Sequence, residues 1–457
     1  MRALCFRLPH SPPPGLPTYH RGMTSLDASP PPAIVWPTPS RPDPAPMRST
    51  GKRVREANRP LPPIELELTG FASGGRAVGH AEDGRVVFVE YGIPGERVVA
   101  EITDEHPGYI EATAVQVLRA SEHRVQAPCQ YFGKCGGCQV QHIDYAEQLR
   151  LKAGVVRDQL ERIGKFAADE ARDLVLPMLG MDDPWGYRNH VRFTVRRDGE
   201  IGFMQRGTHR FMRIDECLIA SPKVNAILDA TQDRTMQTRQ LSVRVGEHTD
   251  EVMIQPKVQW RTGRSHGKLE SGQPSYHERL LGVPYRISGP AFFQVNTRQA
   301  ERLVSLVLEH VREVSPRVVI DAYAGVGTFA AQLAGEVEHV VTIEESAAAG
   351  VDALENLAPF DNVTRVVGKV EDTLPGMTPA PDVVVIDPPR AGIYASVVQA
   401  IIDSAASRVV YVSCDPGTLA RDLRLFTDGG FVIGSIQPVD MFPHTQHIEC
   451  VTVLDRA

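Results

Sequence analysis

The stretch Arg408-Val409-Val410-Tyr411-Val412-Ser413-Cys414-Asp415-Pro416 decides the fold of the C-terminal part of this chain. Its apolar, β-branched residues predict a strand that ends in a serine, a cysteine and an aspartate, and the proline breaks the pattern. The run 383–386 ends similarly, in Asp387-Pro388-Pro389-Arg390. Open α/β sheets bind ligands at the carboxyl ends of their strands, so a thiol and a carboxylate at two such ends predict an active-site rim. The alternative is that Cys414 is a small buried hydrophobe, a common role for a single cysteine.

The segments before these strands predict the same sheet and a nucleotide-like cofactor. Residues 318–320 lead into Asp321-Ala322-Tyr323-Ala324-Gly325-Val326-Gly327-Thr328-Phe329, and a glycine turn between strand and helix brings backbone N–H groups close to a ligand. The next strand, 339–343, ends at Glu344, and an acid at this place is suited to binding a ribose diol. Four strand–helix units therefore predict an α/β domain over residues 289–457, with a doubly wound, parallel, Rossmann-like sheet.

The composition is that of a globular protein with two or three domains: 457 residues, 42% hydrophobic and 23% charged. No run of about 18 apolar residues is present, so we expect no membrane span. Prolines within residues 9–14 interrupt any signal-peptide core, and we expect a cytoplasmic protein. Residues 1–58 hold 13 of the 36 prolines and are expected to be a disordered tail. Cys5, which lies in that tail, is assigned to no site.

Residues 59–120 predict a small β-barrel. Short alternating strands begin at Ile64 and are separated by glycine-rich turns as far as Leu118. The stretch Leu68-Thr69-Gly70-Phe71-Ala72-Ser73-Gly74-Gly75-Arg76-Ala77-Val78-Gly79 resembles a TRAM domain, a small barrel attached to RNA-modifying enzymes. The periodicity alone predicts only a barrel, and nucleic-acid binding is what the resemblance implies.

Residues 121–288 are expected to form a central region with a metal site. Cys129, Cys135 and Cys138 lie within ten residues, and Cys217 is available as a fourth thiolate ligand. In a reducing compartment such a set suits either a structural zinc ion or a [4Fe–4S] cluster. The alternative is that the cysteines bind nothing. The spacing is not the Cys-x3-Cys-x2-Cys of radical enzymes, so radical chemistry is not expected. Residues 145–163 have the period of an amphipathic helix, which we expect to pack on the C-terminal domain.

Residues 187–213 carry a concentration of arginine and aromatic side chains. Seven arginines face two acids there, a local charge of 7 − 2 = +5, whereas the whole chain has a net charge of −7. The arginines are 188, 192, 196, 197, 206, 210 and 213, and the aromatics are Tyr187, Phe193, Phe203 and Phe211. Arginine contacts phosphates and aromatic rings stack on unpaired bases, so the mixture predicts binding to folded or single-stranded RNA. The alternative is a solvated, charged hairpin.

Taken together, these motifs resemble the RNA uracil-5-methyltransferases, which use S-adenosylmethionine. The likeness runs from about Ile64 to the C-terminus. Besides the barrel and the cysteines, it rests on Phe292-Phe293-Gln294-Val295-Asn296, the Asp321–Phe329 turn, Asp387-Pro388-Pro389-Arg390, Ser413-Cys414-Asp415-Pro416 and His447-Ile448-Glu449. One departure is Ala324, which stands where the family turn usually has a cysteine, so this position is not expected to be catalytic. The first 58 residues have no recognised counterpart.

The resemblance implies specific roles. Cys414 would be the nucleophile and Glu449 the general base. The cofactor contacts would be Gln294, Tyr323, Glu344 and Asp387, although Asp387 is also a candidate for the uracil edge. Cys129, Cys135, Cys138 and Cys217 would ligate a [4Fe–4S] cluster rather than zinc. The partner would be ribosomal or transfer RNA, and no protein partner or membrane is expected.

The chemistry requires these groups because C5 of uracil is a poor nucleophile. Attack of a thiolate on C6 makes an enolate whose C5 can accept a methyl group, and a base must then remove the C5 proton. A stacked target base must also be extruded into the pocket. One rival is methylation of adenine N6, which needs no cysteine, or of cytosine C5, which uses a different motif. Another is an RNA-binding protein with a vestigial site, but Cys414 and Glu449 are both present.

Overall fold

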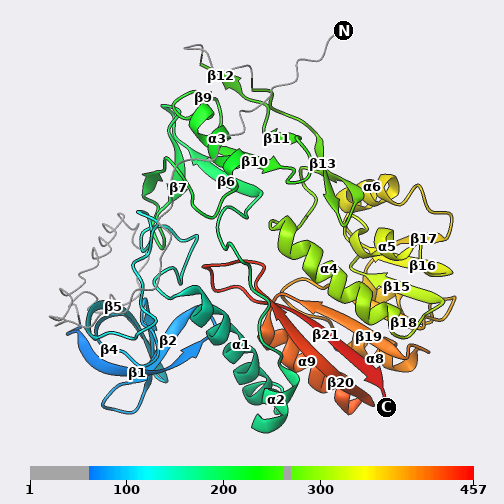
Figure 1. Cartoon of the computed structure of the whole chain (residues 1–457), viewed down its shortest axis with the longest axis horizontal. Coiled ribbons are helices and arrows are strands. Elements are labelled where there is room, and N and C mark those ends of the chain that lie inside the picture. The colour runs from blue at the N-terminus through cyan, green and yellow to red at the C-terminus, as the bar shows by residue number, and fades with distance from the viewer. Residues whose placement is uncertain (1–60, 262–268) are drawn as a thin grey trace, which may run out of the picture.

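The computed structural model describes residues 61–261 and 269–457. The expected N-terminal tail and Cys5 therefore lie outside the described residues. Figure 1 shows a small barrel, a central region and a C-terminal sheet flanked by helices, with the central region reaching over both of the other parts. Within the described ranges, no helix combines the length and apolar character needed to cross a membrane.

The barrel is closed and has five strands in the order β1-β2-β3-β5-β4. The strands are β1 (Ile64–Ala72), β2 (Arg76–His80), β3 (Val86–Glu90), β4 (Arg97–Glu105) and β5 (Tyr109–Arg119). Alternate residues such as Leu66, Leu68, Val87 and Val89 fill its interior, as the period of two along a strand requires. The barrel predicted from the alternation is confirmed.

The central region joins a helical hairpin to an antiparallel sheet. Its elements are α1 (Tyr145–Arg162), α2 (Ala168–Leu174), β6 (His190–Val195), β7 (Ile201–Met204), β8 (Phe211–Arg213), α3 (Pro222–Thr231), β9 (Thr235–Met236), β10 (Gln240–Val245), β11 (Val252–Gln255), β12 (Gln259–Trp260), β13 (Ser275–Leu280) and β14 (Val283–Ser288). Five strands form one sheet in the order β11-β10-β6-β7-β8. Helix α1 begins where the Asp144 side chain accepts a hydrogen bond from the Glu147 N–H.

The C-terminal domain is a seven-stranded sheet in the order β17-β16-β15-β18-β19-β21-β20. Its strands are β15 (Val318–Ala322), β16 (His339–Glu344), β17 (Val363–Val367), β18 (Val383–Ile386), β19 (Arg408–Ser413), β20 (Phe431–Val439) and β21 (Glu449–Arg456), and its helices are α4 (Thr297–Arg312), α5 (Thr328–Leu333), α6 (Ala347–Asn356), α7 (Val370–Thr373), α8 (Ala395–Asp403) and α9 (Pro416–Asp428). The first five strands in sheet order are parallel, but β21 is antiparallel to both neighbours. The predicted α/β class is confirmed, with an antiparallel hairpin completing the sheet.

Helix α1 packs against α9, on the outside of the C-terminal sheet (Figure 1). Val156 and Leu160 of α1 belong to the same buried cluster as Leu419 and Leu423 of α9. The Arg424 guanidinium donates to the Gly164 carbonyl at 2.8 Å, just beyond the end of α1. The chain that precedes the central sheet is thus built into the wall of the C-terminal domain.

Candidate active site

The thiol of Cys414 and the carboxyl of Glu449 lie at adjoining strand ends. Strand β19 ends at Ser413, which pairs with Cys450 of β21. Cys414 therefore follows Ser413, the last paired residue of β19, and Glu449 immediately precedes Cys450, the partner of Ser413 on β21. This placement depends on β21 inserting between β19 and β20. The neighbouring Asp415 has a different task, because its carboxylate accepts from the Thr418 N–H at 2.8 Å and caps α9.

Burial dominates the electrostatics of this pair. It raises the pKa of Cys414 to about 12, with further increases from the charges of Glu449 and Asp387, while Arg390 opposes them. Burial also raises the pKa of Glu449 well above its usual value, again helped by Asp387. Burial alone raises the pKa of Asp387 to about 7. A desolvated carboxyl group favours its neutral form, so burial shifts Glu449 towards its protonated form.

The glycine turn after β15 is held by two carboxylates. Tyr323, Gly325 and Gly327 all have left-handed backbones, with φ of 65°, 56° and 86°. Glu344 accepts from the Gly325 N–H at 2.8 Å and from the Ser346 N–H at 2.6 Å. One oxygen of Asp321 accepts from the Ala330 N–H at 3.0 Å, and the other, which is buried, has no partner. Glu344 thus both shapes the turn and lies at its mouth.

Gln294 and Tyr323 are two further residues expected to contact the cofactor. The side-chain oxygen of Gln294 is buried and has no hydrogen-bond partner, which is unusual for a protein acceptor and is consistent with a ligand donor. The Gln294 backbone carbonyl accepts from the Asn189 side chain at 3.2 Å. Tyr323 is half-buried at the edge of the core, and burial raises the pKa of its hydroxyl.

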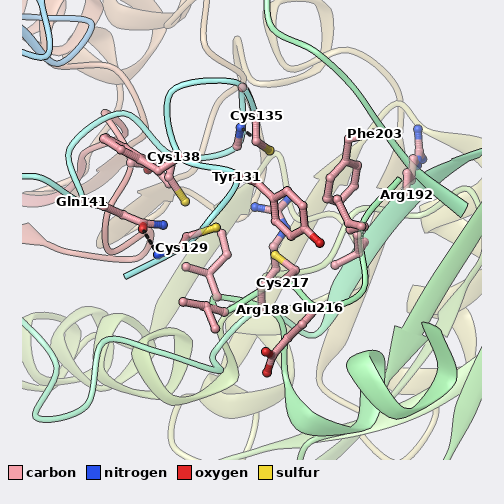
Figure 2. A pocket seen from close by; sticks show the side chains of 18 of the residues that line it. Cys129, Tyr131, Cys135, Cys138, Gln141, Arg188, Arg192, Phe203, Glu216 and Cys217 are labelled. Atoms are coloured by element: carbon pink, nitrogen blue, oxygen red, sulfur yellow. Dashed lines mark hydrogen bonds between the residues drawn. The ribbon is translucent and has the colours of Figure 1, made fainter. Parts of the chain in front are cut away.

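The four expected metal-binding cysteines line one cavity of about 450 Å³ (Figure 2). They are Cys129, Cys135, Cys138 and Cys217. Burial raises the pKa of Cys138 to about 12 and of Cys217 to about 11. In the described part of the chain, no three histidine, cysteine, aspartate or glutamate side chains converge closely enough to hold a single metal ion. The fold therefore brings the four thiols to one hollow without bringing them to one point.

Arg390 and His447 form a contact that no local sequence pattern predicts. The Arg390 guanidinium donates to Nδ1 of His447 at 3.0 Å. Burial, with help from Arg390, lowers the pKa of His447 to about 4, so the ring is neutral near pH 7. Its place in His447-Ile448-Glu449 and the arginine that follows the two prolines were the available signals. The structure also places His447 on the wall of the cysteine cavity.

The arginine-rich segment differs in part from its expected role. Tyr187 and Phe193 are 2% and 1% exposed, so neither ring is available to stack on bases. Phe193 points inward because alternate residues of β6 face the core. Among the residues that the structure describes, at least three of the seven arginines form ion pairs: Arg196 with Glu200, Arg206 with Glu90, and Arg213 with Asp233. The free positive charge is therefore smaller than the composition indicated, while Arg188 and Arg192 line the cysteine cavity.

Comparisons with known proteins agree with this architecture. A profile of the TRAM domain matches residues 64–115, and a profile of the tRNA (uracil-5-)-methyltransferases matches residues 379–457. An uncharacterised RNA methyltransferase of Streptomyces avermitilis is 35% identical over 427 residues, covering 86% of this chain and 98% of the relative. An uncharacterised RNA methyltransferase of Streptomyces coelicolor is 36% identical, and the match covers 86% of this chain and 93% of that relative.

The solved tRNA (uracil-54, C5)-methyltransferase of Pyrococcus abyssi, in complex with S-adenosyl-L-homocysteine, has a TM-score of 0.66 and 26% identity. The match covers 85% of this chain and 99% of that one. Fold and matches together define the class, the S-adenosylmethionine-dependent RNA methyltransferases. Within it, the chain belongs to the RNA uracil-5-methyltransferase family. The resemblance, the enzyme class and the methyl donor expected from the sequence are confirmed.

Proposed function

We propose that this enzyme methylates C5 of a uracil in RNA through a covalent bond between Cys414 and C6, with Glu449 as the base. The observation that carries the proposal is the adjacency of these residues at the ends of β19 and β21. A thiol beside a buried carboxyl group provides a nucleophile and a proton acceptor on one edge of the sheet, where such folds bind their ligands.

The residues act in a balanced sequence. The Cys414 thiolate forms a bond to C6, and the C5=C6 electrons move into an enolate. C5 then forms a bond to the methyl carbon, and the bond from that carbon to sulfur breaks. Glu449 takes the C5 proton, the electrons of the C–H bond restore C5=C6, and the bond to Cys414 breaks, returning the thiolate. S-adenosylmethionine supplies the methyl group when bound.

The charge of Arg390 affects the pKa values of both Cys414 and Glu449. Burial raises the pKa of the Cys414 thiol to about 12, so the protein must favour loss of this proton before the thiolate can attack. Arg390 is the cation that lowers the pKa of both Cys414 and Glu449. We infer that Arg390 favours the thiolate and later the carboxylate form of the base. Its contact with His447 directs the guanidinium.

We assign the methyl donor to the neighbouring strand ends. The unpartnered oxygen of Gln294 and the carboxyl of Asp387 would accept from the donor's amino or hydroxyl groups. Glu344 would meet the ribose diol, since each of its oxygens keeps acceptor capacity beyond one backbone N–H. Tyr323 would pack against the bound cofactor, and Asp387 is also a candidate for contact with the uracil edge.

We assign a [4Fe–4S] cluster to the cysteine cavity. A zinc ion would draw four thiolates to about 2.3 Å from one point, whereas these thiols line a hollow of about 450 Å³. A cuboidal cluster keeps its four thiolate ligands apart and occupies the space between them. The cluster would supply a fixed structural centre, and Cys129, Cys135, Cys138 and Cys217 would hold it.

The substrate would be a folded ribosomal or transfer RNA, from which the uracil is extruded into the site. The barrel, proposed as residues 59–120, and the central region, 121–288, would grip the RNA around the catalytic domain, 289–457. Arg188 and Arg192 lie closest to the cysteine cavity and are suited to phosphate contacts. We place this activity in the cytoplasm.

The test is incubation of the purified enzyme and isotopically labelled S-adenosylmethionine with total tRNA and rRNA separately, followed by nucleoside mass spectrometry. We expect 5-methyluridine from the wild type and none from Cys414→Ala. The RNA that acquires it names the substrate class. Labelled adenosine or cytidine, or 5-methyluridine made equally well by Cys414→Ala, would overturn the proposal.

A further inference from the structure

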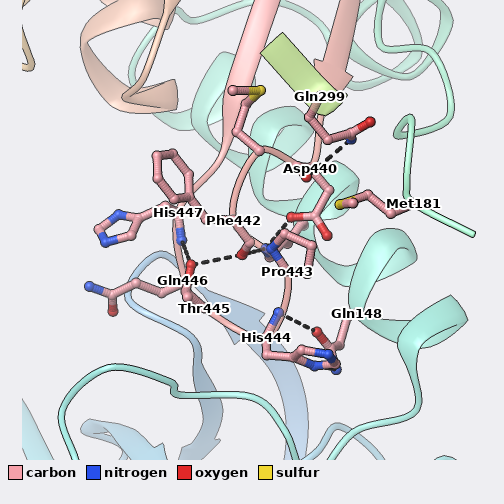
Figure 3. A network of polar contacts seen from close by, with 12 residues as sticks. Gln148, Met181, Gln299, Asp440, Phe442, Pro443, His444, Thr445, Gln446 and His447 are labelled. Atoms are coloured by element: carbon pink, nitrogen blue, oxygen red, sulfur yellow. Dashed lines mark hydrogen bonds and ion pairs between the residues drawn. The ribbon is translucent and has the colours of Figure 1, made fainter. Parts of the chain in front are cut away.

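The loop 440–448 connects β20 to β21 and ends at Glu449. Figure 3 shows it held by polar contacts to segments far away in the chain. Its shape is fixed internally, because the Thr445 hydroxyl donates to the Phe442 carbonyl at 2.8 Å and accepts from the His447 N–H at 3.3 Å. These bonds tie the middle of the loop to His447, two residues before Glu449.

The cysteine segment pairs directly with this loop. The backbone N–H groups of Gln139 and Val140 both donate to the His444 carbonyl, at 3.0 and 3.2 Å. Gln139 follows Cys138, so these hydrogen bonds begin one residue after a cavity cysteine. The loop also forms part of the cavity wall, through Thr445 and His447.

One side chain bridges the two segments. The Gln139 amide donates from Nε2 to the Gly136 carbonyl at 2.8 Å, and its Oε1 accepts from the Gln446 N–H at 3.1 Å. Gly136 lies between Cys135 and Cys138, and Gln446 lies three residues before Glu449. Three residues of extended chain span only about 10 Å, so this bridge lies close to the base.

We propose that Gln139 is a positioning residue that couples the cysteine-lined cavity to the Glu449 carboxyl by holding the loop 440–448 against the segment between Cys135 and Cys138. When the cavity cysteines are fixed, the bridge holds the loop in register and Glu449 stays within reach of the C5 proton. Without the bridge, the thiol still attacks C6 and the methyl group is still transferred, but proton removal slows. This inference rests on the proposed roles of Cys414 and Glu449.

Two variants of Gln139 test the two hydrogen bonds of its side chain separately and together. Gln139→Ala removes both contacts. Gln139→Glu keeps an oxygen that accepts from the Gln446 N–H but loses the donor to the Gly136 carbonyl. Gln399→Ala is the matched control, because this exposed glutamine on α8 bonds only to Asp403 in the described structure. Glu449→Gln is the reference for a lost base.

The experiment measures four quantities on the cluster-containing protein: the visible absorbance, the iron content, the fraction of RNA covalently bound on a denaturing gel, and the turnover. We expect Gln139→Ala to keep its absorbance and KM for RNA, to lower kcat about five- to twentyfold, and to accumulate methylated covalent RNA, with Gln139→Glu intermediate. Gln399→Ala should match the wild type.

Four results are decisive. Unchanged kcat and adduct level in Gln139→Ala would overturn the inference, as would a kcat loss proportional to lost iron without adduct accumulation. Failure of Glu449→Gln to accumulate adduct would instead overturn the proposed base. Accumulation in Glu449→Gln together with none in Gln139→Ala would retain the proposed function and remove only the coupling.

Discussion

The Lys152 ammonium lies 2.6 Å from the Asp440 carboxylate, with both side chains at most 4% exposed. The same ammonium donates to the Phe442 carbonyl at 3.1 Å, and the Tyr145 hydroxyl donates to the second Asp440 oxygen at 2.8 Å. Helix α1 therefore anchors the start of the loop whose end carries Glu449. The helix thus supports the candidate active site although it lies outside the C-terminal sheet.

We expect breaking this pair to be costly. Lys152→Met leaves the Asp440 charge buried without its cation, and Asp440→Asn leaves the ammonium without its anion, at about 3–5 kcal/mol each. Replacing both removes the uncompensated charge, so the double variant should lose much less stability than the sum of the single changes. Urea denaturation of the four proteins measures the coupling. Additive losses would contradict a direct buried interaction.

A second prediction concerns Asp321, which is fully buried with a pKa raised to about 8, chiefly by desolvation. The folded state holds this proton more tightly than the unfolded state, whose pKa lies near 3.8. The wild type therefore loses stability as the pH rises from about 4 to 8. Asp321→Asn keeps an oxygen for the Ala330 N–H and removes the titration. Its thermal midpoint should exceed that of the wild type by more at pH 8 than at pH 5.

A constant difference between the two midpoints across this pH range would contradict that assignment. Glu449→Gln, measured in parallel, should show the same sign, because burial also raises the pKa of Glu449. Thr427→Ala is a control that changes a residue of α9 without a titratable group. Its difference from the wild type should not vary with pH.

The local sequence was enough for elements whose pattern is periodic. The helix expected over 145–163 is observed as Tyr145–Arg162, because its apolar spacing coincides with an aspartate cap at position 144. The strand ends carrying Asp387 and Cys414 were predictable since buried parallel strands are short apolar runs.

Other features depended on long-range pairing. The insertion of β21 beside β19 joins Ser413 to Cys450, and no local pattern specifies it. The expected exposure of Phe193 was wrong, because alternation within β6 buries this ring while leaving Arg192 exposed. The anchors of the loop 440–448 could not be predicted, since Lys152 lies 288 residues before Asp440.

A third prediction uses the reactivity of Cys414. Above about pH 7 the Asp387 carboxyl is ionised and raises the pKa of this thiol. Asp387→Asn removes that charge and should speed alkylation of Cys414 by iodoacetamide a fewfold. The difference should disappear below about pH 6, where Asp387 is neutral in the wild type. Peptide mass spectrometry measures the rate at this cysteine, and equal rates at all pH values would contradict the electrostatic link.

The last prediction concerns RNA binding by the face that carries Arg192. This arginine is exposed on β6 beside the cysteine cavity, and the structure gives it no ion pair among the described residues. Arg192→Ala should weaken RNA binding several-fold at low salt and reduce the slope of log K against log salt by about 0.7, the value for one phosphate contact to a single strand. Arg317→Ala makes the same change in charge at the amino end of β15, the edge of the sheet opposite to Cys414. Titration of both variants with fluorescent RNA should therefore separate them, and an equal loss of affinity would show that only net charge matters.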